Sequence, residues 1–179
     1  MRKLILLDRD GTVNDEVHYL VVPDQLKLIP GAAAGIRRLN QAGYAVAIVT
    51  NQSGVARGYL SLASLDRVHQ RLRELLAKEQ AKVDGIYFCP HLPTDRCACR
   101  KPGSKLATDA AADLGATLKG VIVIGDRECD ILLGRAINAT TILVRTGHGK
   151  LHTQTSPATP DLICTDLNEA SAWILANAT

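Results

Sequence analysis

Short apolar runs alternate with segments of helical periodicity along almost the whole chain, and this alternation restricts the possible folds more than any other feature. The strands predicted from these runs cover residues 3–7, 44–49, 83–88, 121–124, 140–144 and 162–164. The helical segments cover residues 32–41, 61–80, 104–114, 128–137 and 167–176. Strands that alternate with helices in this way form a parallel sheet with helices on both faces. The sequence therefore predicts an α/β fold with a doubly wound, Rossmann-like parallel sheet.

The length of the chain suits one domain, and we expect a single domain over residues 1–179. Ser61 is a typical N-cap for the longest helix. Residues 146–160 are rich in Gly, Thr, Ser and Pro and are predicted to be a linker-like stretch. The segment after residue 147 carries no motif, and its closing helix is expected to serve packing.

The composition excludes several classes of partner. Lys and Arg number 21 and Asp and Glu 18, which leaves a net charge of +3, and aromatic residues make up only 3%. Without a basic run or a base-stacking surface, nucleic acid is not an expected partner. The opening apolar run ends at residue 7 and is too short for a secretion signal or a membrane span. We expect a cytoplasmic protein with no membrane contact, and a monomer, because no apolar helix stripe is left over.

Polar side chains follow the apolar runs directly. Asp8 and Asp10 come after the first run, Thr50 after the second and Asp126 after the fourth. In doubly wound sheets the carboxyl ends of the strands carry the ligand site. Two carboxylates two residues apart at a strand end suit a hard divalent cation such as Mg²⁺, or a nucleophile with an acid–base partner. For the first pair taken alone, an Asp-Gly turn beside a charged loop is the alternative.

Four elements, taken together and in this order, resemble the signature motifs of the haloacid dehalogenase-like (HAD) superfamily. They are Asp8-Arg9-Asp10-Gly11-Thr12, Val49-Thr50-Asn51, Lys101 and Gly125-Asp126-Arg127-Glu128-Cys129-Asp130. The resemblance covers the catalytic core, residues 3–147. It implies a HAD fold and phosphoryl transfer through an aspartyl-phosphate, with Mg²⁺ as the catalytic cofactor. An acid at the second position of the first motif favours a hydrolase.

The resemblance implies a role for each of these residues. Asp8 would be the nucleophile, and Asp10 would protonate the leaving alcohol and then activate water. Thr50 would donate a hydrogen bond to the transferring phosphoryl group, and Lys101 would balance its charge. Asp8, Asp126 and the backbone carbonyl of Asp10 would hold Mg²⁺.

A second group of possible metal ligands lies within residues 89–99. Cys89, His91, Cys97 and Cys99 supply three sulfur atoms and one imidazole, a set that can form a closed tetrahedral Zn²⁺ site. Because the protein would fill all four positions, the zinc would be structural. Unliganded thiols are the alternative. The other two of the five cysteines stand alone in the sequence.

The Cys-Pro-His and Cys-x-Cys-Arg-Lys-Pro segments around this cluster resemble the heptose bisphosphate phosphatase family, in which a short zinc-binding loop stands in place of a cap domain. The resemblance implies a Mg²⁺-dependent phosphatase that removes the 7-phosphate of a phosphosugar, in the synthesis of activated heptose for lipopolysaccharide or other surface glycans. The implied substrate contacts are Glu16, Val17, His18, Tyr19, Asn51, Gln52, Ser53, Arg100 and Arg127.

Two alternatives to this function stay open. A histidinol-phosphate phosphatase would use the same core on a substrate with one phosphate and a cationic amine, whereas Arg100 and Arg127 favour a second anion. A zinc-stabilised binding module with an inert core is opposed by the complete set of motif residues.

The roles of two further residues also stay open. Asp130 would either orient other groups or bind Mg²⁺ through water. Lys105 departs from the pattern of the relatives and would either contact phosphate or lie in solvent. The preferred anomer is not set by the sequence.

Overall fold

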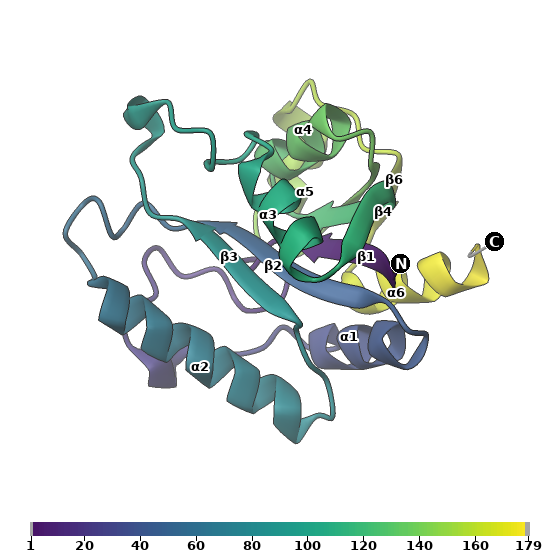
Figure 1. Cartoon of the computed structure of the whole chain (residues 1–179), viewed down its shortest axis with the longest axis horizontal. Coiled ribbons are helices and arrows are strands. Elements are labelled where there is room, and N and C mark those ends of the chain that lie inside the picture. The colour runs from purple at the N-terminus through teal and green to yellow at the C-terminus, as the bar shows by residue number, and fades with distance from the viewer. Residues whose placement is uncertain (1, 178–179) are drawn as a thin grey trace.

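The computed structural model describes residues 2–177, and its centre is a six-stranded sheet (Figure 1). In chain order the strands are β1 (Arg2–Leu7), β2 (Ala45–Asn51), β3 (Gly85–Cys89), β4 (Ala116–Gly125), β5 (Thr140–Val144) and β6 (Leu162–Cys164). Their spatial order is β3-β2-β1-β4-β5-β6, and every neighbouring pair is parallel. The predicted doubly wound parallel sheet is confirmed. The ends of the expected domain, residues 1 and 178–179, lie outside the described residues.

Helices cover both faces of the sheet (Figure 1). One face carries α1 (Ala32–Gln41), α2 (Leu62–Lys78) and α6 (Leu167–Ala176), and the other carries α3 (Lys105–Asp113) and α4 (Glu128–Ala136). A short helix, α5 (Gly149–Thr155), follows β5. Ser61 caps α2 as predicted, because its hydroxyl accepts a hydrogen bond from the Ser64 amide at 3.1 Å.

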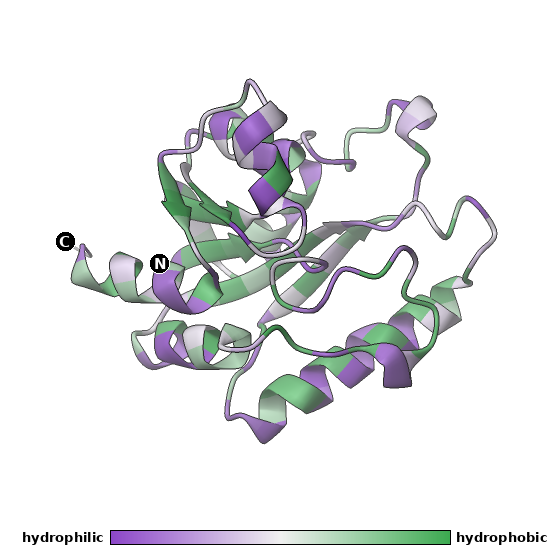
Figure 2. Ribbon diagram, turned by 180° about the vertical axis from the view of Figure 1, so that it is seen from behind, coloured by the Kyte–Doolittle hydropathy of each residue, from purple (hydrophilic) through white to green (hydrophobic). Residues whose placement is uncertain are grey.

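Alternate side chains of the central strand enter opposite halves of the core. Ile5 and Leu7 of β1 pack with α1, α2 and α6, whereas Leu4 and Leu6 pack with α3. All four are fully buried, which is why the strand is a continuous apolar run in the sequence. Figure 2 shows apolar strands enclosed by helices that carry much of the polar surface. Within residues 2–177, every helix is too short or too polar to span a bilayer.

Two segments differ from the sequence prediction. The stretch 146–160, predicted to be a linker, contains α5, a helix of mostly polar residues that buries Gly149 and His152 against the rest of the protein. β4 begins at Ala116 and not at residue 121. Its first half is partly exposed and is interrupted by Gly120 at φ +73°, so it lacks the apolar run that marks a buried strand.

The topology brings the predicted site residues to one edge of the sheet. Because all strands are parallel, Asp8 after β1, Thr50 near the end of β2 and Asp126 after β4 share the carboxyl edge. β1 lies between β2 and β4, where the strand order reverses, and ligands of doubly wound sheets bind at this switch point. The Cys/His loop (residues 89–99) leaves the end of β3 and projects away from the sheet (teal in Figure 1). No separate cap domain is present in the part of the chain that the structure describes.

Candidate active site and metal clusters

Three carboxylates meet at the switch point between β1 and β4. Asp8 follows β1, Asp126 follows β4, and Asp130 lies in the first turn of α4. One oxygen from each lies within 4.8 Å of the other two, and all three residues are buried. Asp126 Oδ1 is buried without a hydrogen-bond partner. An orphaned carboxylate oxygen beside two other carboxylates is a suitable ligand set for a hard cation such as Mg²⁺.

The electrostatics of this cluster also favour a cation. Burial and the neighbouring carboxylates raise the pKa of Asp8 to about 7, although Lys101 opposes this shift. Burial, with Asp8 and Asp130 beside it, raises the pKa of Asp126 to about 8. A divalent cation at the shared oxygens would offset the repulsion between the carboxylates. Asp8 and Asp126, two of the three predicted ligands, therefore fit a Mg²⁺ site.

Two glycines enclose Asp126. Gly11 has a φ of +82° and Gly147 a φ of +53°, and a Cβ atom on either would collide with Asp126 Oδ2. Thr146 Oγ1 donates a hydrogen bond to the Gly11 carbonyl at 2.6 Å and so joins the two loops. The His148 amide donates to Asp126 Oδ2 at 2.7 Å. The close approach of backbone to this carboxylate requires glycine at both positions.

Lys101 forms ion pairs with two members of the cluster. Its ammonium group donates to Asp8 Oδ1 and Asp130 Oδ1, each at 2.6 Å, and to the Val49 carbonyl at 2.7 Å. Burial acts to lower its pKa, but Asp130 and Asp8 raise the pKa above the ordinary lysine value. Lys101 is therefore a fixed positive charge. Asp130 uses its second oxygen to accept from the Arg127 amide at 3.1 Å, which favours the orienting role over water-mediated metal binding.

The side chain of Asn51 fixes the backbone of Lys101. Its Oδ1 accepts from the Lys101 amide at 2.9 Å, and its Nδ2 donates to the Lys101 carbonyl at 3.2 Å. Both polar atoms of the Asn51 side-chain amide are therefore bonded to the backbone that follows the Cys/His loop.

Lys105, at the start of α3, forms an exposed ion pair with Asp109 at 2.8 Å. This contact favours the solvent position for Lys105.

Asp10 faces a separate set of partners. Its carboxylate accepts from Arg9 Nη2 at 2.8 and 2.9 Å, and from Asn14 Nδ2 and Gln52 Nε2 at 2.9 Å each. Burial acts to raise the pKa of Asp10, but the Arg9 guanidinium and the two amides lower the pKa below the ordinary carboxyl value. Sequence reasoning missed Arg9 and Asn14. Their one available signal is that both lie within four residues of Asp10.

A cavity of about 270 Å³ lies over these groups. Twelve of the predicted residues line it: Asp8, Asp10, Val17, His18, Tyr19, Thr50, Asn51, Gln52, Ser53, Arg100, Lys101 and Arg127. Asp126 is not among the lining residues, and neither is Glu16. The Glu16 carboxylate accepts from Arg127 Nη2 at 2.8 Å and lies 3.6 Å from His148 Nε2, so it contacts an arginine of the cavity wall. Cys129, which stood alone in the sequence, also lines the cavity.

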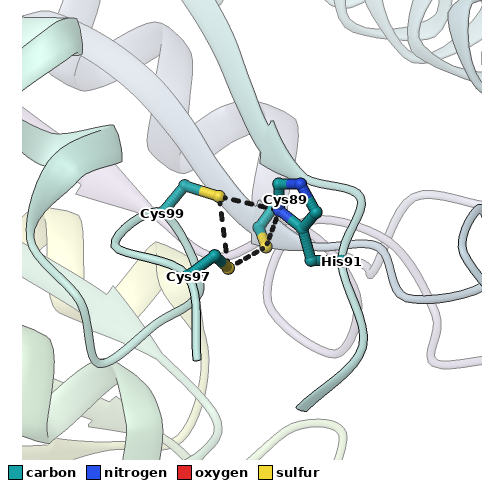
Figure 3. A group of neighbouring side chains, drawn as sticks. All are labelled: Cys89, His91, Cys97 and Cys99. Atoms are coloured by element: carbon teal, nitrogen blue, oxygen red, sulfur yellow. Dashed lines mark hydrogen bonds between the residues drawn. The ribbon is translucent and has the colours of Figure 1, made fainter. Parts of the chain in front are cut away.

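The four predicted zinc ligands converge in the loop that follows β3 (Figure 3). Cys97 Sγ lies 3.5 Å from both Cys89 Sγ and Cys99 Sγ. His91 Nδ1 lies 3.2 Å from Cys99 Sγ and 3.6 Å from Cys89 Sγ. A tetrahedral site with Zn–S bonds of about 2.3 Å has ligand–ligand separations of roughly 3.5–3.8 Å. The four atoms therefore enclose a space close to the size that Zn²⁺ requires, and Nδ1 is the imidazole atom that faces it.

This fold, with its carboxylate cluster, buried lysine and Thr50 at the switch point, defines a HAD-like hydrolase. The HAD-hydrolase-like family matches residues 98–170 of the chain. The D-glycero-beta-D-manno-heptose-1,7-bisphosphate 7-phosphatase of Pseudomonas aeruginosa is 44% identical over 149 residues, which cover 83% of this chain and 84% of the relative. The chain belongs to the family of D-glycero-D-manno-heptose-1,7-bisphosphate 7-phosphatases.

Further relatives extend the match over nearly the full length. The enzyme of the same name from Bordetella bronchiseptica is 38% identical and covers 98% of this chain and 99% of the relative. The crystal structure of the D,D-heptose 1,7-bisphosphate phosphatase from B. bronchiseptica, complexed with magnesium and phosphate, superimposes with a TM-score of 0.91 at 37% identity, covering 98% and 99% of the two chains. The corresponding Burkholderia thailandensis structure has a TM-score of 0.77 at 30% identity and covers 98% of this chain and 100% of that one.

Proposed function

We propose that this protein is a Mg²⁺-dependent phosphatase that removes the 7-phosphate of D-glycero-β-D-manno-heptose 1,7-bisphosphate in the synthesis of activated heptose. The observation that carries the proposal is the buried cluster of Asp8, Asp126 and Asp130, in which Asp8 and its ion-pair partner Lys101 line a polar cavity. The names of the Pseudomonas and Bordetella relatives support the β anomer. The magnesium and phosphate in the Bordetella structure support the cofactor and the reaction class.

In this proposal Asp8, Asp126 and the backbone carbonyl of Asp10 hold Mg²⁺. When bound, the cation supplies Lewis-acid stabilisation of the phosphoryl oxygens and offsets the negative charge of the nucleophile. The Cys/His loop binds Zn²⁺ through Cys89, His91, Cys97 and Cys99. With no free ligand position, that metal stabilises the loop and takes no part in the chemistry.

The chain's own residues perform the first half of the reaction. A carboxylate oxygen of Asp8 attacks phosphorus, and the bond between phosphorus and the C7 oxygen of the sugar breaks. Asp10 gives a proton to that oxygen. Its carboxyl gains this proton as the substrate binds, because the negative charge of the phosphate raises the pKa of a nearby carboxyl. Thr50 Oγ1 accepts from Gln52 Nε2 at 3.0 Å, so its own proton is free to donate to a phosphoryl oxygen.

The second half regenerates the free enzyme. Asp10, now a carboxylate, takes a proton from a water molecule as the water oxygen attacks phosphorus. The bond between phosphorus and the Asp8 oxygen breaks, and inorganic phosphate leaves. Throughout both halves the Lys101 ammonium group neutralises charge on the nucleophile and the phosphoryl group.

The cavity wall favours a substrate with a second phosphate. Arg100 and Arg127 line the cavity together with Lys101. A guanidinium group binds phosphate oxygens through two parallel N–H groups. These arginines would repel the cationic amine of histidinol phosphate, the alternative substrate.

The test is phosphate release in the presence of Mg²⁺ from three compounds: both anomers of the heptose bisphosphate and histidinol phosphate. We expect fastest turnover of the β anomer. A preference for histidinol phosphate would keep the reaction and overturn the substrate. Absence of release from all three compounds would contradict the assignment of the active site.

A further inference from the structure

A buried arginine, Arg9, bonds to Asp10 and also lines the cavity. The Arg9 side chain is only 1% exposed. Burial of a guanidinium group is costly unless its N–H groups are paired. Three of its hydrogen bonds go to Asp10: Nε to Oδ1 at 3.1 Å, and Nη2 to Oδ1 at 2.9 Å and to Oδ2 at 2.8 Å.

His69 of α2 holds the other end of this guanidinium group. Arg9 Nη1 lies 3.2 Å from His69 Nε2. An arginine can only donate, so Nε2 accepts and carries no proton. Burial and the adjacent Arg9 charge lower the pKa of His69 to about 3, which keeps the imidazole neutral. The ring of His69 packs against Phe88 of β3 at a centroid distance of 5.6 Å. α2 and β3 thereby fix the position of Arg9.

The two oxygens of Asp10 have different surroundings. Oδ2 accepts from Gln52 Nε2, a group of the cavity wall, at 2.9 Å. Oδ1 accepts from Asn14 Nδ2 at 2.9 Å, within the loop that follows β1. Since Arg9 bonds to both oxygens, it sets the rotation of the carboxylate and hence which oxygen faces the substrate.

We infer that Arg9, held by His69, is a positioning residue that fixes the Asp10 carboxylate with Oδ2 toward the substrate for proton exchange. The inference rests on the proposed role of Asp10 as acid and base. Arg9 acts through Asp10 and needs no contact with the reacting atoms. The donor fork of an arginine suits this task, because two parallel N–H groups define an orientation that a single ammonium group does not.

Substrates with different leaving groups can distinguish a positioning role of Arg9 from a merely structural ion pair. A sugar alkoxide is a poor leaving group and depends on a well-placed acid, whereas p-nitrophenolate leaves without a proton. Loss of positioning should therefore slow the first turnover of heptose bisphosphate far more than the first turnover of p-nitrophenyl phosphate. General damage to the site would slow both.

The principal variant is Arg9→Lys, which keeps the charge and removes the fork. We expect first-turnover release of the sugar to fall about 10- to 100-fold with KM changed by less than about threefold, and release of p-nitrophenolate to fall by less than about threefold. His69→Leu removes the acceptor of Nη1 and should show the same selective loss in smaller degree. His69→Gln retains an acceptor and should restore the parental ratio of the two rates.

Two controls make the outcome specific. Arg38→Lys alters another well-bonded arginine, one that joins α1 to Asn168 and Ser171 of α6, and should leave both rates unchanged. Asp10→Asn must itself show the leaving-group dependence, and equal losses on both substrates there would contradict the proposed function. If Asp10→Asn shows the dependence while Arg9→Lys slows both substrates equally or neither, the inference about Arg9 alone is overturned. Should Arg9→Lys fail to fold, equal rate ratios in His69→Leu and His69→Gln would overturn it.

Discussion

The ammonium group of Lys101 donates a hydrogen bond of 2.6 Å to Asp8 Oδ1, although 93 residues separate the two in the sequence. β1 places the carboxylate at the edge of the sheet, and the Asn51 amide pins the backbone of the lysine from the end of β2. Both groups therefore stand in position before a substrate arrives. Preorganised charge of this kind lowers a barrier without reorganisation during the reaction.

Asp8→Asn should abolish turnover and preserve the fold. The amide cannot form the phosphorylated intermediate, so we expect phosphate release to fall at least about 10³-fold. In Mg²⁺-free buffer the melting temperature should not fall, because repulsion from Asp126 and Asp130 is relieved. Phosphate release and thermal melts measure the two effects. Asp109→Asn, at an exposed ion pair, is the matched control and should behave as the parent. Full activity of Asp8→Asn would remove Asp8 from the nucleophile role.

The stability of the Mg²⁺-free protein should depend on pH in a defined direction. The pKa of Asp8 is raised to about 7 and that of Asp126 to about 8. Between roughly pH 4 and pH 8 the folded state holds protons that the unfolded chain has released, so the free energy of unfolding falls as pH rises through this window.

Added Mg²⁺ binds the deprotonated carboxylates and should reverse this loss. The rise in melting temperature on addition of MgCl₂ should therefore be larger at pH 8 than at pH 6. Mg²⁺ is best removed by dialysis without a chelator, so that the Cys/His loop keeps its metal. A larger effect at pH 6 than at pH 8 would contradict the carboxylate cluster as the binding site.

Cys97→Ser should lower both the zinc content and the stability. One of four converging ligands is lost, and we expect a fall in melting temperature of about 5 °C or more. Substrate binding should also weaken, because Arg100 directly follows Cys99 in the chain. The matched control is Cys164→Ser, which changes a buried thiol outside the cluster and should leave the zinc content at the parental level. Parental zinc content in Cys97→Ser would refute the zinc site.

Arg100→Ala should affect a bisphosphate more than a monophosphate. A charged hydrogen bond to a second phosphate is worth about 1.5 kcal/mol or more, so KM for the bisphosphate should rise about tenfold or more. KM for a heptose 7-phosphate should change little. Arg96→Ala is the control, since Arg96 is exposed in the same loop and does not line the cavity. Equal effects of Arg100→Ala on the two substrates would show that Arg100 does not bind the second phosphate.

The elements that could be predicted from the sequence are those whose residues keep one local pattern from end to end. β5 (Thr140–Val144) and α6 (Leu167–Ala176) have the predicted bounds. A run of β-branched and apolar residues marks β5, and apolar residues at helical spacing mark α6, and both are local signals. α5 was missed because its polar residues show neither pattern. The helix is seen only in the structure, where it buries Gly149 and His152.

The residues of the candidate site also differ in whether the sequence predicts them. Asp8, Thr50 and Asp126 could be predicted because parallel strands bring their carboxyl ends together. Arg9 could not, because an arginine between two acids is normally a solvated residue, and here the packing of α2 over the loop buries it. His69 was hidden for a related reason: it borders the apolar stripe of α2 and resembles a core residue until its partner is known.

Gly115 and Gly147 share a positive φ, +58° and +53°, but differ in what surrounds them. A Cβ atom at Gly115 would meet nothing within 4 Å, whereas one at Gly147 would collide with Asp126 Oδ2 and the Gly11 backbone. Alanine at either position costs about 1–2 kcal/mol in backbone conformation. Only at 147 must the carboxylate also move, so a Mg²⁺ titration of activity should separate the two variants. In terms of evolution, the same carboxylate restricts positions 11 and 147 to glycine, although these positions lie near opposite ends of the catalytic core in the sequence. Neither can acquire a side chain, whatever the other becomes, while Asp126 stands between them.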